Sequence, residues 1–471
     1  MSLRASVSYL FVRAAAGMLG MLALSLFVRG LGPERYGHFA LGIAAAALAS
    51  NLLIIPLNST LARLYGEAEL RRPLLATTAG IVWLAGAFCL LLALVVELLG
   101  LSWLPKWVLP AAAVFAASQG AVDYAAQTAT SALQPARYGK LLLWRAVGIC
   151  GLGITALHAG GGVLGVLMGM ALASMLGVLL SNSVSSLDAA EFDPKLLPRI
   201  SAFALPLVGS CALTYLLQWG DRYVLAHNVE MADVGRYSAL ADLTTQALML
   251  LSSGLSSAWY PRVVQAWGAG DRDEAERLMS RYALMGLAFL LPAGLGLACT
   301  LQGIAAVLFG GEYVGLPAAL PVMLVLAACL SVSKNFFFDV RILLAERVWR
   351  QAVGIALSAG VALLVMFGTV GRLGVLAAAL GLLSGQLTGI LYSIVAGRGV
   401  LRLRIDLRAA CIVVAGCAAM VAVLLYWPAG GGVVSLALRI MAGALTYGLV
   451  LLACDLDGIR GRLLAVWRGA R

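Results

Sequence analysis

Several ionisable residues lie inside long apolar stretches of this sequence. Asp123 and Lys334 each fall near the middle of such a stretch. An ionisable group in the core of a lipid bilayer costs free energy, so it is a candidate for a functional role unless its side chain reaches the headgroups. The embedded candidates are Arg13, Arg29, Asp123, Asp221, Arg222, Asp242, Lys334, Asp339 and Arg341.

The cations among these residues could bind an anionic ligand, because ammonium and guanidinium groups match phosphate oxygens. They are Arg13, Arg29, Arg222 and Lys334. Arg13 could instead extend to the headgroups, and Arg29 could instead stabilise the C-terminus of a helix.

The other embedded residues are candidates for gating or for coupling transport to an ion. They are Asp123, Asp221, Asp242, Asp339 and Arg341. An alternative interpretation is structural, with Asp221 and Arg222 forming one local pair and Asp339 and Arg341 another.

No residue cluster predicts a metal site or an enzyme active site. The three histidines are isolated, and none of the eight cysteines forms a CxxC pair. Asp455 and Asp457 form a DxD pattern, but no nucleotide-binding domain accompanies it, so we interpret it as a surface cap. We therefore expect no catalytic residues, no metal and no cofactor.

The composition is that of a protein in contact with lipid. Of 471 residues, 62% are hydrophobic and 12% are charged, which leaves more apolar surface than a soluble protein of this length can bury. The net charge of +11 comes from short segments between the apolar stretches, so membrane topology explains it and we expect no nucleic-acid partner.

The apolar stretches predict an all-α polytopic membrane protein with about fourteen transmembrane helices, each needing about 20 residues. The expected helices are 8–29, 37–57, 74–99, 107–132, 141–158, 162–183, 201–220, 237–259, 280–309, 317–341, 351–370, 373–396, 409–427 and 433–454. Between them, Asp271 is the expected N-cap of a helix that follows it.

The distribution of Lys and Arg predicts that both termini are cytoplasmic. With that orientation, 25 of these residues lie on the inner side and seven on the outer side. The longest outer segment, 221–236, has about sixteen residues, which is too short for a folded outer domain.

An internal repeat divides the chain. Four short segments recur in order at an offset of about 200 residues, which predicts two parallel six-helix bundles around a central cavity. The pairs are 36–39 with 234–237, 61–64 with 260–263, 133–137 with 344–347, and 164–167 with 373–376. We expect an N-lobe at 1–185, a C-lobe at 186–400, and two additional helices with a cytoplasmic tail at 401–471.

The repeat places Asp123 and Lys334 at equivalent positions in the two bundles. If both faced a cavity between the bundles, they could form an ion pair that acts as a gate or as a proton-coupling element. Stripes of small residues at every fourth position predict close helix packing, and they occur at 161, 165, 169, 173 and 177 and at 381, 385 and 389.

Short motifs resemble those of the polysaccharide transporter family, within the multidrug/oligosaccharidyl-lipid/polysaccharide exporter superfamily. The segment 29–41 is similar to the family's LGPxxYG, and Asp221–Leu225 with 234–238 is similar to its paired DR and GxY motifs. Phe309–Tyr313 resembles its fGxxY, and Phe203–Pro206 its alP. Together the motifs cover about residues 8–400.

The resemblance implies a flippase for undecaprenyl-diphosphate-linked oligosaccharide, serving O-antigen or exopolysaccharide assembly in a bacterial inner membrane. It would act by alternating access as a monomer, in contact with membrane lipid and possible polymerase and assembly proteins. Arg13 could then meet the diphosphate. Two alternatives stay open: a cation-coupled multidrug exporter of the same superfamily, and a polymerase or ligase of lipid-linked sugars, for which the expected large outer loop is missing.

Overall fold

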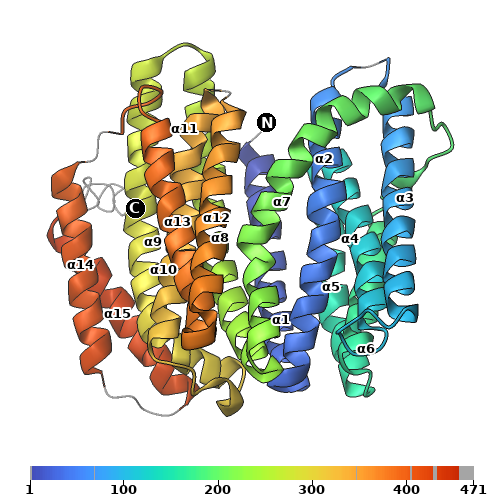
Figure 1. The fold of residues 1–471 in the computed structure, drawn as a ribbon. Helices are drawn as coiled ribbons and strands as arrows, with labels where there is room; N and C mark the ends of the chain where they lie inside the picture. Colours follow the sequence, from blue (N-terminus) through green and yellow to red (C-terminus); the bar gives the residue numbers. More distant parts are fainter. Residues whose placement is uncertain (1–2, 68, 346, 404–405, 428–431, 456–471) are drawn as a thin grey trace. The chain divides into compact units, whose positions relative to one another are not determined.

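The computed structural model describes residues 3–67, 69–345, 347–403, 406–427 and 432–455 (Figure 1). Within these residues the chain forms helices and no strand, which confirms the predicted all-α membrane fold. Asp457 of the DxD pattern and the tail from 456 to 471 lie outside the described residues.

Contacts divide the chain into two compact units. Unit 1 contains residues 1–239 and 363–378. Its elements are α1 (Leu3–Ala49), the π-helical turn η1 (Ser50–Ile54), α2 (Ile55–Leu64), α3 (Arg71–Leu98), α4 (Val108–Ser131), α5 (Pro135–His158), α6 (Gly162–Leu180), the 3₁₀ turns η2 (Val184–Leu187) and η3 (Pro194–Leu196), and α7 (Leu197–Asn228). Part of its core is a cluster around the buried side chains of Leu61, Tyr124 and Leu141.

Unit 2 contains residues 240–362 and 379–471. Its elements are α9 (Arg272–Leu308), the 3₁₀ turn η4 (Gly311–Tyr313), α10 (Ala319–Ser333), the π-helical turn η5 (Lys334–Phe338), α11 (Asp339–Leu344), α14 (Leu407–Tyr426) and α15 (Val433–Ala453). Three helices contribute residues to both units: α8 (Met231–Gly268), α12 (Val348–Leu373) and α13 (Val375–Ala396). The boundaries expected from the sequence, at 185 and 400, come from repeated segments and not from contacts. They therefore stay a prediction.

All fourteen predicted apolar segments fall within or largely within these helices. Eleven helical stretches are long and apolar enough to cross a membrane by length and composition, and the first of them, from 15 to 64, covers two predicted segments. The helices α4 and α8 are outside those eleven, so the count of fourteen stays a prediction, while the multi-pass membrane fold is shown.

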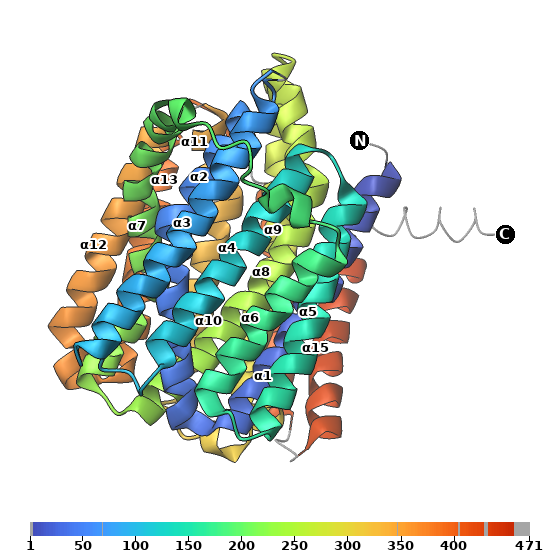
Figure 2. The same cartoon turned by 90° about the vertical axis from the view of Figure 1, so that its right-hand side faces the viewer.

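Small residues allow α5 and α6 to lie side by side in unit 1 (Figure 2). A Cβ atom on Gly169 would lie 2.9 Å from the carbonyl oxygen of Leu152, and one on Gly177 would lie 3.2 Å from the backbone nitrogen of Arg145. These backbone contacts confirm the packing role predicted for the small-residue stripe in 162–183.

Two copies of the repeated motif meet in unit 1. The chain turns at Gly32 (φ 74°), and just beyond this turn Gly37 approaches the start of α8. A Cβ on Gly235, the repeat equivalent of Gly37, would lie 1.9 Å from the carbonyl oxygen of Pro33 and 2.9 Å from the nitrogen of Gly37. The glycines of the two motifs are therefore required by a direct backbone crossing.

Candidate functional site

A buried ion pair joins Lys334 and Asp339 in unit 2. The Lys334 ammonium donates to Oδ2 of Asp339 at 2.8 Å, and the two side chains are 4% and 3% exposed. The π-helical turn η5 produces this pair, because its backbone hydrogen bond runs from the N–H of Asp339 to the carbonyl of Lys334, five residues earlier. A regular α-helix would place residues five apart on different faces.

One face of α13 is shaped to fit this pair. Ser393 donates to Oδ1 of Asp339 at 2.6 Å, so both carboxylate oxygens have a donor. A Cβ on Gly389 would lie 2.8 Å from Cε of Lys334, and a Cβ on Gly397 would lie 3.1 Å from Cζ of Arg341. Gly389 and Ser393 lie in α13 and Gly397 directly follows its last residue; their spacing of four aligns them along one face of the helix.

Arg341 adds a second buried cation next to the pair. Its residue is 5% exposed, and its Cζ lies 5.5 Å from the ring centroid of Phe338. Within the described part of the chain, its Nε and Nη2 atoms are buried without a hydrogen-bond partner. The hydrogen bonds of Asp339 go to Lys334 and Ser393, and the local pair of Asp339 with Arg341 stays a prediction. The cluster therefore holds two cations and one carboxylate.

In unit 1, Asp123 belongs to a polar network on α4. Its carboxylate accepts from the Gln119 amide at 2.8 Å and from the Ser50 hydroxyl at 3.4 Å, and Ser50 is the first residue of the π-helical turn η1. The Gln119 carbonyl oxygen in turn accepts from the Arg145 guanidinium. Asp123 and Lys334 thus each have hydrogen bonds within their own unit, and a direct pair between them stays a prediction.

Asp221 ties together two of the motif segments in unit 1. Its Oδ2 accepts from the Tyr237 hydroxyl at 2.6 Å, and its Oδ1 accepts from the backbone N–H of Arg222 at 2.9 Å. The Arg222 guanidinium lies 4.3 Å from the ring centroid of Trp219. Asp221 and Arg222 are 3% and 4% exposed, so their environment accords with the structural interpretation.

The remaining candidates lie apart along the chain. Arg29 is exposed near the turn of α1, and Asp242 is half-buried in α8. Arg13 falls in α1, and its side chain is outside the described part of the structure. In the described residues, no group of three or more His, Cys, Asp or Glu side chains could hold a metal ion.

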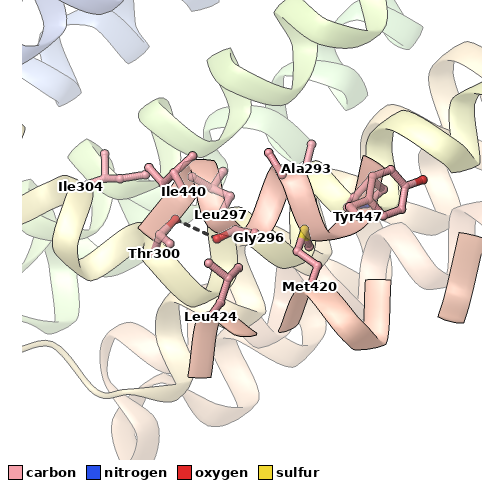
Figure 3. Close-up of a pocket in the computed structure, with 12 residues that line it drawn as sticks. Ala293, Gly296, Leu297, Thr300, Ile304, Met420, Leu424, Ile440 and Tyr447 are labelled. Atoms are coloured by element: carbon pink, nitrogen blue, oxygen red, sulfur yellow. Dashed lines mark hydrogen bonds between the residues drawn. The ribbon is translucent and has the colours of Figure 1, made fainter. Parts of the chain in front are cut away.

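An apolar pocket of about 330 Å³ lies between α9, α14 and α15 of unit 2 (Figure 3). Its walls include Leu297 and Ile304 of α9, Met420 of α14 and Ile440 of α15. The hydroxyl of Thr300 donates to the Gly296 carbonyl at 2.7 Å, so this polar group is satisfied within its own helix. The pocket therefore suits an apolar ligand, and two of its three walls are the helices outside the predicted repeat.

Sequence reasoning missed Ser393, Gln119 and the pocket. One signal for Ser393 was present, because the stripe of small residues at 381, 385 and 389 continues at the same spacing to 393 and 397. Nothing in the sequence indicates that α9 packs against α14 and α15, because α9 is far from both of them along the chain.

Known structures share this fold. The structure titled "Lipid II flippase MurJ, inward closed conformation" superposes with a TM-score of 0.78 at 13% identity, covering 97% of this chain and 100% of that one. An inward-facing multidrug resistance MATE family transporter of the MOP superfamily gives a TM-score of 0.59 at 17% identity, covering 83% of this chain and 97% of that one. An outward-facing MATE transporter gives 0.56 at 14% identity, covering 84% of this chain and 94% of that one.

No curated protein sequence matches the chain. A family model described as "Polysaccharide biosynthesis protein" does match, over residues 2–267, which is more than half of the length. The family predicted from the motifs is therefore confirmed, and the fold is that of flippases and transporters. This chain belongs to the polysaccharide biosynthesis protein family.

Proposed function

We propose that this protein is a flippase that moves undecaprenyl-diphosphate-linked oligosaccharide from the inner to the outer leaflet by alternating access. It would serve O-antigen or exopolysaccharide biosynthesis in the bacterial inner membrane. We expect it to act as a monomer, with the lipid-linked glycan and membrane lipid as its partners and with polymerase and assembly proteins downstream.

The observation that carries the proposal is the apolar pocket between α9, α14 and α15. Its volume of about 330 Å³ lies within the range of ligand-binding pockets, roughly 300–1,000 Å³. A polyprenyl chain loses little by moving from the bilayer into this pocket, because both surroundings are apolar. The lipid end of the substrate could therefore be held while its polar end crosses.

The charge of the cluster in unit 2 also supports an anionic substrate. Lys334 and Arg341 outnumber Asp339, which leaves one positive charge in a buried environment. A cation-coupled exporter of cationic drugs would be better served by an acidic site. The extent of the structural match also favours a flippase over a multidrug exporter. The lipid II flippase structure covers 97% of this chain, and the MATE transporter structure covers 83%.

Two carboxylates are the candidates for ion coupling. Asp123 accepts from the Gln119 amide, and Asp339 accepts from Lys334 and Ser393, so removing the charge of either carboxylate would rearrange those bonds. Asp123→Asn keeps the shape of the side chain and removes its charge. We expect it to fold and to slow export, and unchanged export would exclude a coupling role for this residue.

The test of the proposed function is deletion of the gene, followed by analysis of lipid-linked sugars. A flippase predicts accumulation of complete repeat units on undecaprenyl diphosphate at the cytoplasmic face, with loss of surface polysaccharide. Repeat units that reach the outer leaflet without polymerising would support the polymerase alternative. Normal surface polysaccharide with reduced drug tolerance would support the multidrug exporter.

A further inference from the structure

The turn between α3 and α4, residues 99–107, presents two tryptophans to the surroundings of unit 1. Trp103 is 55% exposed and Trp107 is 50% exposed. The predicted topology places this turn on the outer side of the membrane, at headgroup level. Exposed tryptophans at that level are usual in membrane proteins, so exposure alone indicates no site.

An interfacial position does not explain the backbone conformation of Trp107. This residue has φ 67° and ψ 0°, in the left-handed region that a bulky side chain rarely adopts. Such strain persists only where the surroundings fix it, and it gathers at functional sites. Here Glu97 fixes it, because its Oε1 accepts from the backbone N–H of Trp107 at 3.0 Å.

Glu97 also has an unused acceptor. Its second oxygen, Oε2, is shielded from solvent and has no hydrogen-bond partner among the described residues. Because solvent does not reach this oxygen, a ligand hydroxyl does not reach it either, and Glu97 acts on the turn through the backbone of Trp107.

Trp103 is held in place on one side only. Its ring contacts that of Tyr223 edge-on, with centroids 6.1 Å apart, and the Tyr223 hydroxyl lies 3.0 Å from that of the buried Tyr215. The ring of Trp103 is therefore oriented by α7, while more than half of the residue's surface stays exposed. A rigid aromatic surface of this kind binds with little loss of conformational entropy.

We propose that the turn 99–107 is a sugar-binding platform, on which Trp103 and Trp107 stack against the glycan of the translocated lipid, while Glu97 holds the backbone of Trp107. Sugars present apolar C–H faces, and these match the faces of the exposed indole rings. The platform receives the glycan on the outer face as the lipid-linked product leaves. This inference rests on the proposed flippase function.

The test uses the oligosaccharide released by mild acid from the lipid-linked intermediate that accumulates in the deletion strain. Its binding to the purified full-length protein is measured by isothermal titration. Trp103→Leu and Trp107→Gly should each weaken binding several-fold, and together about tenfold. Trp103→Phe, which keeps an aromatic ring, should restore most of the affinity.

Leu133→Gly is the matched control. Leu133 also has a positive φ, 55°, and is 72% exposed at the other end of α4. Glycine relieves the strain at both positions, so Trp107→Gly and Leu133→Gly should both raise the thermal stability of the protein. Only Trp107→Gly should weaken glycan binding.

Two other outcomes distinguish failure of the platform from failure of the flippase function. If the intermediate accumulates but the wild-type protein does not bind its glycan, or the tryptophan variants bind as tightly as wild type, the turn is an interfacial anchor and the platform is refuted. If no intermediate accumulates on deletion, the flippase function fails, and the platform fails with it.

Discussion

Replacing Lys334 with methionine should strongly destabilise unit 2. The substitution removes the ammonium and leaves the Asp339 carboxylate, 3% exposed, with only the Ser393 hydroxyl as donor. Breaking a buried ion pair from one side costs roughly 3–5 kcal/mol, because the remaining charge stays buried. Ser393→Ala removes one hydrogen bond to a charged group and should cost less, about 1.5–3 kcal/mol.

The double variant Lys334→Met with Asp339→Leu separates charge from packing. Removing both partners of a buried ion pair is often neutral or stabilising, so this variant should recover most of the stability that Lys334→Met loses. Arg341 limits the recovery, because its buried guanidinium loses the nearby carboxylate. Adding Arg341→Met should remove that remaining penalty.

The assay is equilibrium unfolding of the purified protein in detergent, with export of surface polysaccharide measured in the same variants. If the pair takes part in transport, the double variant should be folded at normal levels and inactive in export. The reasoning would be refuted if Lys334→Met were as stable as wild type, or if the double variant were as unstable as the single one. A stable and active double variant would assign the pair a dispensable structural role.

Two further substitutions, each with its own control, test the backbone crossing and the apolar pocket. Gly235→Ala places a Cβ 1.9 Å from a backbone carbonyl oxygen and should severely reduce the amount of folded protein. Its control, Gly209→Ala, lies in open space within α7 and should stabilise the protein by about 1 kcal/mol. Thermal unfolding of the two variants tests both expectations. Gly296→Leu should fill the apolar pocket and slow export. Its control, Gly360→Leu, lies in open space within α12 and should leave export unchanged. Equal export by both variants would exclude a role of the pocket in transport.

Features that depend on local sequence were predictable. The hydropathy of single segments located the helices, and Asp271 is indeed an N-cap, with its carboxylate accepting from the N–H of Glu274 at 3.0 Å. The small-residue stripe of 381, 385 and 389 also packs as expected, since a Cβ on Gly385 would lie 2.5 Å from the carbonyl oxygen of Ser358. Each of these follows from spacing along one helix.

The partners of the embedded charges were not predictable in the same way. Lys334 was located correctly inside an apolar stretch, but its partner is five residues along, where α-helical periodicity expects no contact. A π-helical turn has no pattern of residue types comparable to that of an α-helix, so the sequence does not predict it. The apolar pocket depends on how α9, α14 and α15 pack, which no single segment encodes.

The two π-helical turns have a common relation to the embedded carboxylates. In unit 1, η1 begins at Ser50, which donates to Asp123, and in unit 2, η5 begins at Lys334, which donates to Asp339. A π-helical turn contains one residue more than an α-helical turn, so converting it to α-helix rotates everything beyond it. In unit 2 this rotation would separate Lys334 from Asp339. The helix geometry and the ion pair are therefore linked, because the contact between Lys334 and Asp339 depends on the π-helical turn.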